Sequence, residues 1–137
     1  MVLLIKNGCV INPAGGFEGV ADVLIGDGKV WKIGKGIRLE EELAKKGKET
    51  EEVVVIDAEG KVVAPGLVDV HVHFRDPGFT YKEDILSGAR AAARGGFTTV
   101  VLMANTKPAV DNAETLSYVL EKGRETGIHV YTCANVT

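Results

Sequence analysis

The stretch DVHVHFRDPG occupies residues 69–78 and determines how the rest of the chain is interpreted. Its polar members Asp69, His71 and His73 are spaced two apart between apolar residues, so we expect their side chains on one face of an extended strand. Two imidazoles on one face can share a metal ion. Arg75 takes the next same-face position, and the Pro-Gly pair then ends the strand. The group is therefore expected at the carboxyl end of a strand, where the sites of parallel α/β folds collect.

The residues from 65 onward alternate between strand and helix patterns. A run of strand, helix, strand, helix, strand predicts a right-handed parallel βαβαβ unit of the α/β class. A (β/α)8 barrel takes roughly 250 residues, so residues 65–137 are expected to be the start of a longer, truncated barrel. The predicted strands are 67–73, 97–103 and 128–136, and the predicted helices are 82–94 and 111–126.

Residues 1–64 predict a separate β-rich portion. Favoured turn residues indicate hairpins at Asn7-Gly8, at Asp27-Gly28 and at residues 58–60. The charged segment 35–52 carries only two leucines at helical spacing, so a solvated excursion with one short helix is expected, and a partner-binding helix is the less favoured alternative.

Composition restricts the class of protein. The chain has 137 residues, 45% of them hydrophobic and 26% charged, with a net charge of −3. This balance gives no electrostatic reason to expect nucleic acid or an anionic membrane as partner. No window approaches the ~18 apolar residues of a membrane span, and the opening residues are too short an apolar run for a signal peptide. Cys9 and Cys133 form no motif and leave a disulfide open, but a cytoplasmic location with reduced thiols is the simpler expectation.

The histidine pair is an incomplete metal site by itself. Neutral imidazoles and carboxylates suit zinc, and at least one further ligand has to come from elsewhere. His129 is expected at the amino end of the third strand, away from the site, in a structural or solvent-facing position. Asp69 either orients a ligand histidine or bonds to a neighbouring loop, and it lies early on the strand for a direct ligand.

Arg75 and Asn105 are the candidate substrate contacts. The planar fork of arginine pairs with a carboxylate through two hydrogen bonds, so a carboxylate substrate is expected next to the metal pair. Asn105 follows the second predicted strand at the equivalent carboxyl end, where it could add a directional hydrogen bond or serve only as a turn residue.

Together these motifs resemble those of the dihydroorotase family, cyclic amidohydrolases of the amidohydrolase superfamily. The resemblance rests on GLVDVHVHFRDPGFTYKEDI (66–85) and GARAAARGGFTTVVLMANTKPAVDN (88–112) and covers the whole chain. The family pattern has an HxH pair, an Arg two residues later, and a Met-Pro-Asn-Thr motif with a Pro two positions on. Ala104 stands where the family has the first proline, a change expected to loosen the loop that carries Asn105.

The resemblance implies that His71 and His73 bind zinc and that His73, Arg75 and Asn105 contact the substrate. It implies the reversible hydrolysis of L-dihydroorotate to N-carbamoyl-L-aspartate, a step of pyrimidine synthesis. No catalytic residue is expected within this chain, because the proton-transferring Asp and the remaining ligands would lie beyond Thr137. Residues 1–64 would form part of a small β-sandwich, and a homodimer or an aspartate transcarbamoylase complex would be the protein partner. The 137 residues alone are expected to bind zinc weakly and to be inactive.

Two other readings stay open. Allantoinases and hydantoinases resemble the same stretch, but allantoinases tend to carry Asn where this chain has Arg75, which suits a neutral substrate. A non-catalytic scaffold homologue is the second alternative, although such proteins often lose metal ligands and both His71 and His73 are present.

Overall fold

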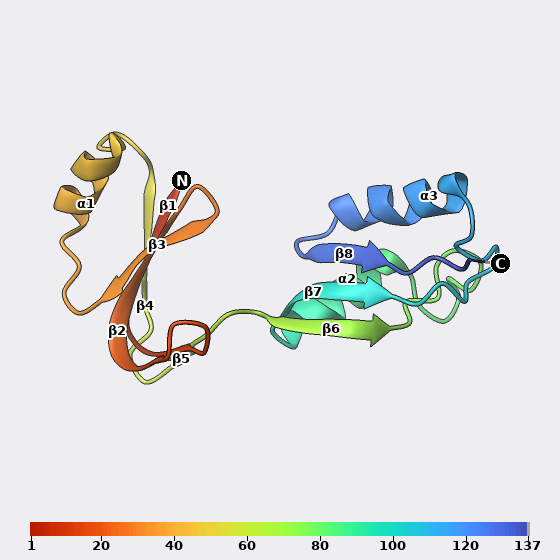
Figure 1. The fold of residues 1–137 in the computed structure, drawn as a ribbon, viewed down its shortest axis with the longest axis horizontal. Coiled ribbons are helices and arrows are strands. Elements are labelled where there is room, and N and C mark those ends of the chain that lie inside the picture. The colour runs from red at the N-terminus through yellow and green to blue at the C-terminus, as the bar shows by residue number, and fades with distance from the viewer. Residues whose placement is uncertain (137) are drawn as a thin grey trace. The chain divides into compact units, whose positions relative to one another are not determined.

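The computed structural model describes residues 1–136, which divide after Pro65 into two compact units. The first unit contains β1 (Val2–Asn12), β2 (Phe17–Gly26), β3 (Lys29–Gly34), α1 (Leu39–Lys46), β4 (Val53–Asp57) and β5 (Val62–Val63). The second contains β6 (Leu67–Val72), α2 (Ile85–Arg94), β7 (Phe97–Leu102), α3 (Ala113–Arg124) and β8 (His129–Thr132), as Figure 1 shows. None of the helices in residues 1–136 has the length and apolar character needed to cross a membrane.

The first unit is one sheet with strand order β3-β2-β1-β4, and β5 pairs with β1. The predicted hairpin at Asp27-Gly28 is confirmed, because both residues have positive φ, 51° and 70°, and join the antiparallel strands β2 and β3. Such backbone angles match the twist of a two-residue hairpin turn.

The predicted hairpin at Asn7-Gly8 is wrong. Here β1 continues without turning, and one extra residue between Ile5 and Gly8 forms a β-bulge against β2. Asn7 takes the positive φ of 62°, and its backbone N–H donates to the Asp22 carboxylate at 3.0 Å. A turn dipeptide therefore produced a kink within a strand, because the ladder with β2 continues on both sides of it.

The hairpin predicted around residues 58–60 is also wrong. Instead, β4 and β5 both run parallel to β1, beside its first and second halves respectively. The connection passes the bulge, with the Ala58 N–H donating to Lys6 and the Cys9 N–H to Lys61. The two strands thus each pair with β1, and not with each other as the turn residues had suggested.

The short helix expected in the charged segment is confirmed as α1. Leu43 is buried and Leu39 packs beside it on the sheet's core. The polar side is held by Glu42, whose carboxylate accepts hydrogen bonds from Lys32 at 2.6 Å and Lys45 at 2.8 Å. The segment is therefore a solvated helix that contributes an apolar edge to its own unit.

The second unit is the predicted βαβαβ arrangement, with three parallel strands in the order β6-β7-β8. Both helices begin later than predicted because a polar side chain caps each one. Asp84 accepts the Ser87 N–H in a capping box before α2, and Asn112 accepts the Thr115 N–H before α3. These caps satisfy amide groups that a helix leaves without partners at its start.

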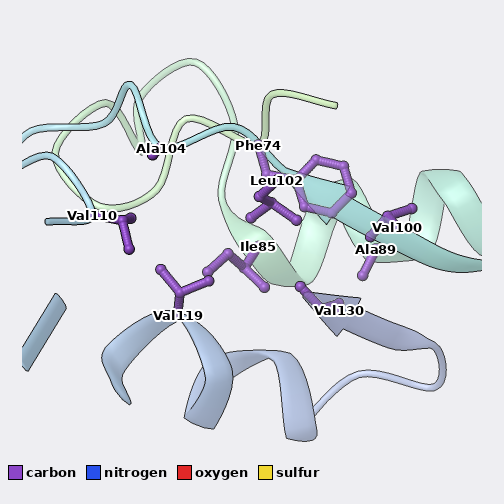
Figure 2. Packing of buried hydrophobic residues seen from close by; sticks show 9 residues of the cluster. All are labelled: Phe74, Ile85, Ala89, Val100, Leu102, Ala104, Val110, Val119 and Val130. Atoms are coloured by element: carbon purple, nitrogen blue, oxygen red, sulfur yellow. The ribbon is translucent and has the colours of Figure 1, made fainter. Parts of the chain in front are cut away.

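One apolar core joins both helices to one face of this sheet, and Figure 2 shows its side chains meeting between the ribbons. Ile85 of α2 is fully buried, and Val100 of β7 and Val119 of α3 are each 1% exposed. Phe74 follows β6 and is 4% exposed within the same cluster. The core therefore extends to the carboxyl ends of the strands and fixes the backbone from which the candidate site residues project.

Candidate metal centre

A β-bulge divides β6 within the stretch that carries the histidines. Asp69 pairs with Val100 and Val72 pairs with Leu102, so between these two pairs β6 has two residues where β7 has one. Both β7 partners are buried against the helices. Asp69 and Val72 therefore face the same side although they are three residues apart.

The expectation that Asp69 shares a face with the two histidines is thus wrong. Asp69 borders a space between β6 and α2, together with Val72 and Phe74. Its carboxylate accepts the backbone N–H of His71 at 2.9 Å. Asp69 therefore bonds to the backbone that carries a histidine, and within residues 1–136 it bonds neither to an imidazole nor to a neighbouring loop.

His71 and His73 face the side of the sheet that the helices leave open, because they flank Val72, which faces the helices. Their ring centroids are 5.4 Å apart and the planes meet at 61°. With zinc–nitrogen bonds of about 2.0–2.1 Å and a tetrahedral angle, two ligand imidazoles have centroids roughly 5 Å apart. The centroid separation of the two rings is therefore close to the one that a shared zinc ion would require.

Asn105 meets His73 across the two strand ends. It lies in the loop after β7, and its Oδ1 is 3.0 Å from His73 Nδ1. An amide oxygen only accepts hydrogen bonds, so this contact fits the tautomer with the proton on Nδ1, in which Nε2 keeps the lone pair that a metal needs. Second partners of this kind orient metal-binding histidines.

The loop that carries Asn105 is anchored despite the departure from the family's proline. Ala104 is 5% exposed within the core, and its carbonyl accepts the Val110 N–H at 3.1 Å. Burial and a backbone hydrogen bond therefore hold the loop at Ala104.

Arg75 lies beyond the end of β6, which stops at Val72, so strand alternation does not set its direction. It has a positive φ of 62° and its carbonyl accepts the Phe79 N–H at 2.9 Å. Its side chain is half-buried. Among residues 1–136 no carboxylate forms an ion pair with it, so the guanidinium is available to a ligand.

Asp76 is the neighbour that sequence reasoning missed. It is fully buried, and its carboxylate accepts hydrogen bonds from Tyr118 and Lys122 of α3, each at 2.8 Å. The hydrogen bond that Lys122 donates to Asp76 raises the pKa of Lys122. The available signal was the spacing of Tyr118 and Lys122, which lie four residues apart on one helix face.

The other histidine and the two cysteines form no contact with this pair within the part of the chain that the structure describes. His129 begins β8, is exposed as expected, and stacks beside Tyr131 with a centroid separation of 6.4 Å. Cys9 and Cys133 are free thiols. Within residues 1–136 no group of three or more His, Cys, Asp or Glu side chains could hold a metal.

Solved structures with similar folds point to one class of protein. D-hydantoinase matches with a TM-score of 0.70 and 32% identity, over 96% of this chain and 26% of that chain. The dihydropyrimidinase of Brevibacillus agri matches with a TM-score of 0.71 and 27% identity, over 96% and 26% respectively. Together with the histidine pair at the strand end, these matches place the chain among the cyclic amidohydrolases.

The sequence comparison narrows the class to a family. The family model described as Dihydro-orotase-like matches residues 60–137, so the chain belongs to the dihydroorotase-like family. It is 54% identical over 136 residues to the dihydroorotases of Clostridioides difficile and Streptococcus pneumoniae. These matches cover 99% of this chain and 30% of each relative. The chain thus spans less than a third of the length of the curated relatives it matches.

Proposed function

We propose that the chain is the part of a dihydroorotase that supplies one half of its zinc site and its contacts to the substrate carboxylate. The reaction is the reversible hydrolysis of L-dihydroorotate to N-carbamoyl-L-aspartate. The observation that carries the proposal is the meeting of His71, His73 and Asn105 at the carboxyl ends of β6 and β7, with Arg75 two residues on. A dihydroorotate ring combines a hydrolysable amide with a carboxylate. The amide matches the pair of metal-binding histidines, and the carboxylate matches the unpaired arginine beside them.

Each residue has a chemical role in this proposal. His71 and His73 hold zinc, which when bound supplies Lewis acidity and lowers the pKa of a coordinated water toward ~7. Arg75 binds the substrate carboxylate with its planar fork. Asn105 keeps His73 in the tautomer that binds metal, while its amide N–H groups remain free to donate to the substrate.

The proposed architecture is the front of a (β/α)8 barrel in residues 65–137 and a β-sandwich portion in residues 1–64. In this proposal a proton-transferring Asp and the remaining metal ligands come from barrel strands beyond Thr137. A barrel brings the carboxyl ends of all its strands to one face, which is where the histidine pair lies on β6.

A hydantoinase-like activity is the second candidate, favoured by the solved structures of similar fold. Arg75 separates the two, because a carboxylate substrate requires a cation where a neutral ring does not. A scaffold without activity is the third candidate, and the retention of both histidines and of the His73–Asn105 hydrogen bond argues against it.

A chimera tests the proposal. Residues 1–136 of this chain replace the matching segment of the Clostridioides difficile dihydroorotase, and the purified chimera is assayed with L-dihydroorotate. We expect hydrolysis that a chelator abolishes and zinc restores. Arg75→Ala should lower kcat/KM for L-dihydroorotate roughly ten- to a hundredfold, since hydrogen bonds to charged groups contribute about 1.5–3 kcal/mol. Arg90→Ala, at an exposed position of α2, is the matched control.

The outcomes separate the candidates. A folded, zinc-loaded chimera that hydrolyses hydantoin and leaves L-dihydroorotate intact supports the hydantoinase reading. Full activity on L-dihydroorotate after Arg75→Ala contradicts the carboxylate role. For the 137 residues alone we expect weak zinc binding and no turnover, and chelator-sensitive hydrolysis by that chain would contradict this.

The proposed setting is the cytoplasm and the synthesis of pyrimidines. A homodimer or a complex with aspartate transcarbamoylase is the proposed assembly, and sedimentation of the chimera alone and mixed with that enzyme would distinguish the two.

A further inference from the structure

The buried carboxylate of Asp76 connects the loop after β6 to α3. Tyr118 donates to its Oδ1 and Lys122 to its Oδ2, each at 2.8 Å. The backbone N–H of Ile85, at the start of α2, donates to Oδ2 at 3.3 Å. A fully buried side chain on a loop is thus held by both helices of the second unit.

Such an ion pair contributes little net stability. Removing a carboxylate and an ammonium from water costs about as much as their attraction returns, and apolar residues of similar volume often serve as well. What the pair provides is a fixed position for the backbone around Asp76. The residue whose position matters most is its neighbour Arg75.

Arg75 lies between two residues that cannot move freely. Phe74 is 4% exposed in the core and Asp76 is 0% exposed. Between them Arg75 holds a positive φ of 62°, a conformation uncommon for a residue with a side chain. The backbone of Arg75 is therefore fixed on both sides while its guanidinium has no ion-pair partner among residues 1–136.

A second connection ties this loop to the one that carries Asn105. The Lys107 N–H donates to the Pro77 carbonyl at 3.1 Å. Gly78 packs so closely on Lys107 that a β-carbon there would lie 1.8 Å from the Lys107 carbonyl oxygen. The spacing between Arg75 and Asn105 is consequently set by backbone contacts that Asp76 anchors.

We propose that Asp76, held by Lys122 and Tyr118, is a positioning residue that presents Arg75 to a carboxylate ligand. The carboxylate itself rests on the function proposed above. Lys122 has a second effect in this arrangement, because it occupies the Asp76 oxygen that would otherwise attract the neighbouring guanidinium. Without Lys122, the Asp76 carboxylate loses its cation and competes with the ligand for Arg75.

The test uses the 137-residue chain and its amide NMR spectrum. Lys122→Met should move the resonances of Arg75 and Phe79 while those of the core strand β7 stay in place. It should weaken the binding of L-dihydroorotate roughly tenfold or more, as expected for the loss of one charge-assisted contact. Lys122→Arg should restore both readouts, and Arg124→Met, which removes an exposed cation from the same helix, should change neither.

Tyr118→Phe removes one hydrogen bond without changing packing volume, so it keeps the test informative if Lys122→Met fails to fold. It should move the same two resonances by a smaller amount. Folded variants at Lys122 and Tyr118 with wild-type Arg75 and Phe79 signals would overturn the positioning role. Shifted Arg75 signals in a chain that does not bind L-dihydroorotate would support the positioning role, while a chimera that fails to hydrolyse L-dihydroorotate would count against the proposed function alone.

Discussion

Gly88 in α2 faces the ring of Phe74, and an alanine at this position should destabilise the second unit although it favours the helix. A β-carbon on Gly88 would lie 2.4 Å from Cδ1, 2.6 Å from Cγ and 2.7 Å from Cε1 of Phe74. Ordinary contacts begin near 3.4 Å, so the ring has to retreat by about 1 Å. The ring is 4% exposed and enclosed by the core.

The size of the effect is a difference between two opposing contributions. Extra methyl groups in a packed core cost typically ~1–3 kcal/mol, and alanine in place of glycine stabilises a helix interior by ~1 kcal/mol. Since the Phe74 ring is enclosed, the upper end of the packing cost applies, and Gly88→Ala should lower the free energy of unfolding by about 2 kcal/mol. Urea unfolding followed by circular dichroism measures this, and Trp31, the single tryptophan, reports the first unit separately.

Two further variants make the result decisive. Gly127→Ala adds the same methyl group where no heavy atom lies within 4 Å, so its effect should stay within about 0.5 kcal/mol. The double variant Gly88→Ala, Phe74→Leu should recover part of the loss by shrinking the obstructing ring. If Gly88→Ala alone were as stable as the wild type or more stable, the ring would be free to move and the packing argument would be refuted.

Three other changes have expected outcomes. Asn105→Ala should weaken zinc binding roughly 10–100-fold, measured by competition with a coloured chelator, because His73 loses the partner that fixes its tautomer. Ile85→Ala should cost about 2–5 kcal/mol in urea unfolding, since the side chain is fully buried; a loss below 1 kcal/mol would mean that the core closes around the gap. Hydrogen bonds from Lys32 and Lys45 lower the pKa of Glu42 from 4.5 to about 2, so their stabilisation is complete above pH 4.5 and is lost as the pH falls toward 2. Glu42→Gln should reduce the fall in melting temperature between pH 4.5 and pH 2, measured by thermal melts. An unchanged fall would mean that other carboxylates cause it.

The second unit was predictable because its signals are local. Apolar spacing identified α2 and α3, and buried apolar runs identified the strands, so the βαβαβ order follows from periodicity. The helix starts were misplaced by a few residues because Asp84 and Asn112 act as N-caps. An N-cap residue has an extended backbone, and the sequence pattern does not show at which polar residue the backbone changes from extended to helical.

The first unit was less predictable because its pairing is not local. Asn7-Gly8 and residues 58–60 both carry turn residues, yet β1 pairs with β4 and β5 from more than forty residues away. Turn chemistry describes what a dipeptide tolerates, whereas long-range pairing decides whether the chain reverses there.

The candidate site was predicted in part. His73 and Asn105 were singled out separately, and the structure brings them within hydrogen-bonding distance. The face of Asp69 was wrong because the β6 bulge depends on the register with β7, which no pattern within β6 reveals. Asp76 was overlooked because a buried charge is recognisable only from its partners on α3.

The bulge in β6 also determines how mutations along this strand should be tolerated. Before the bulge the odd-numbered position Asp69 faces the helices, and after it the even-numbered position Val72 does. A saturation scan of residues 67–74 should therefore show a parity switch, with intolerance to large polar substitutions moving from odd to even positions at the bulge. Deleting Val70 would remove the extra residue between Asp69 and Val72 and restore regular alternation, with Asp69 and Val72 toward the helices and the two histidines still on the open side. One irregular residue is thus the reason that a carboxylate two residues before His71 faces the helices while both imidazoles face the open side.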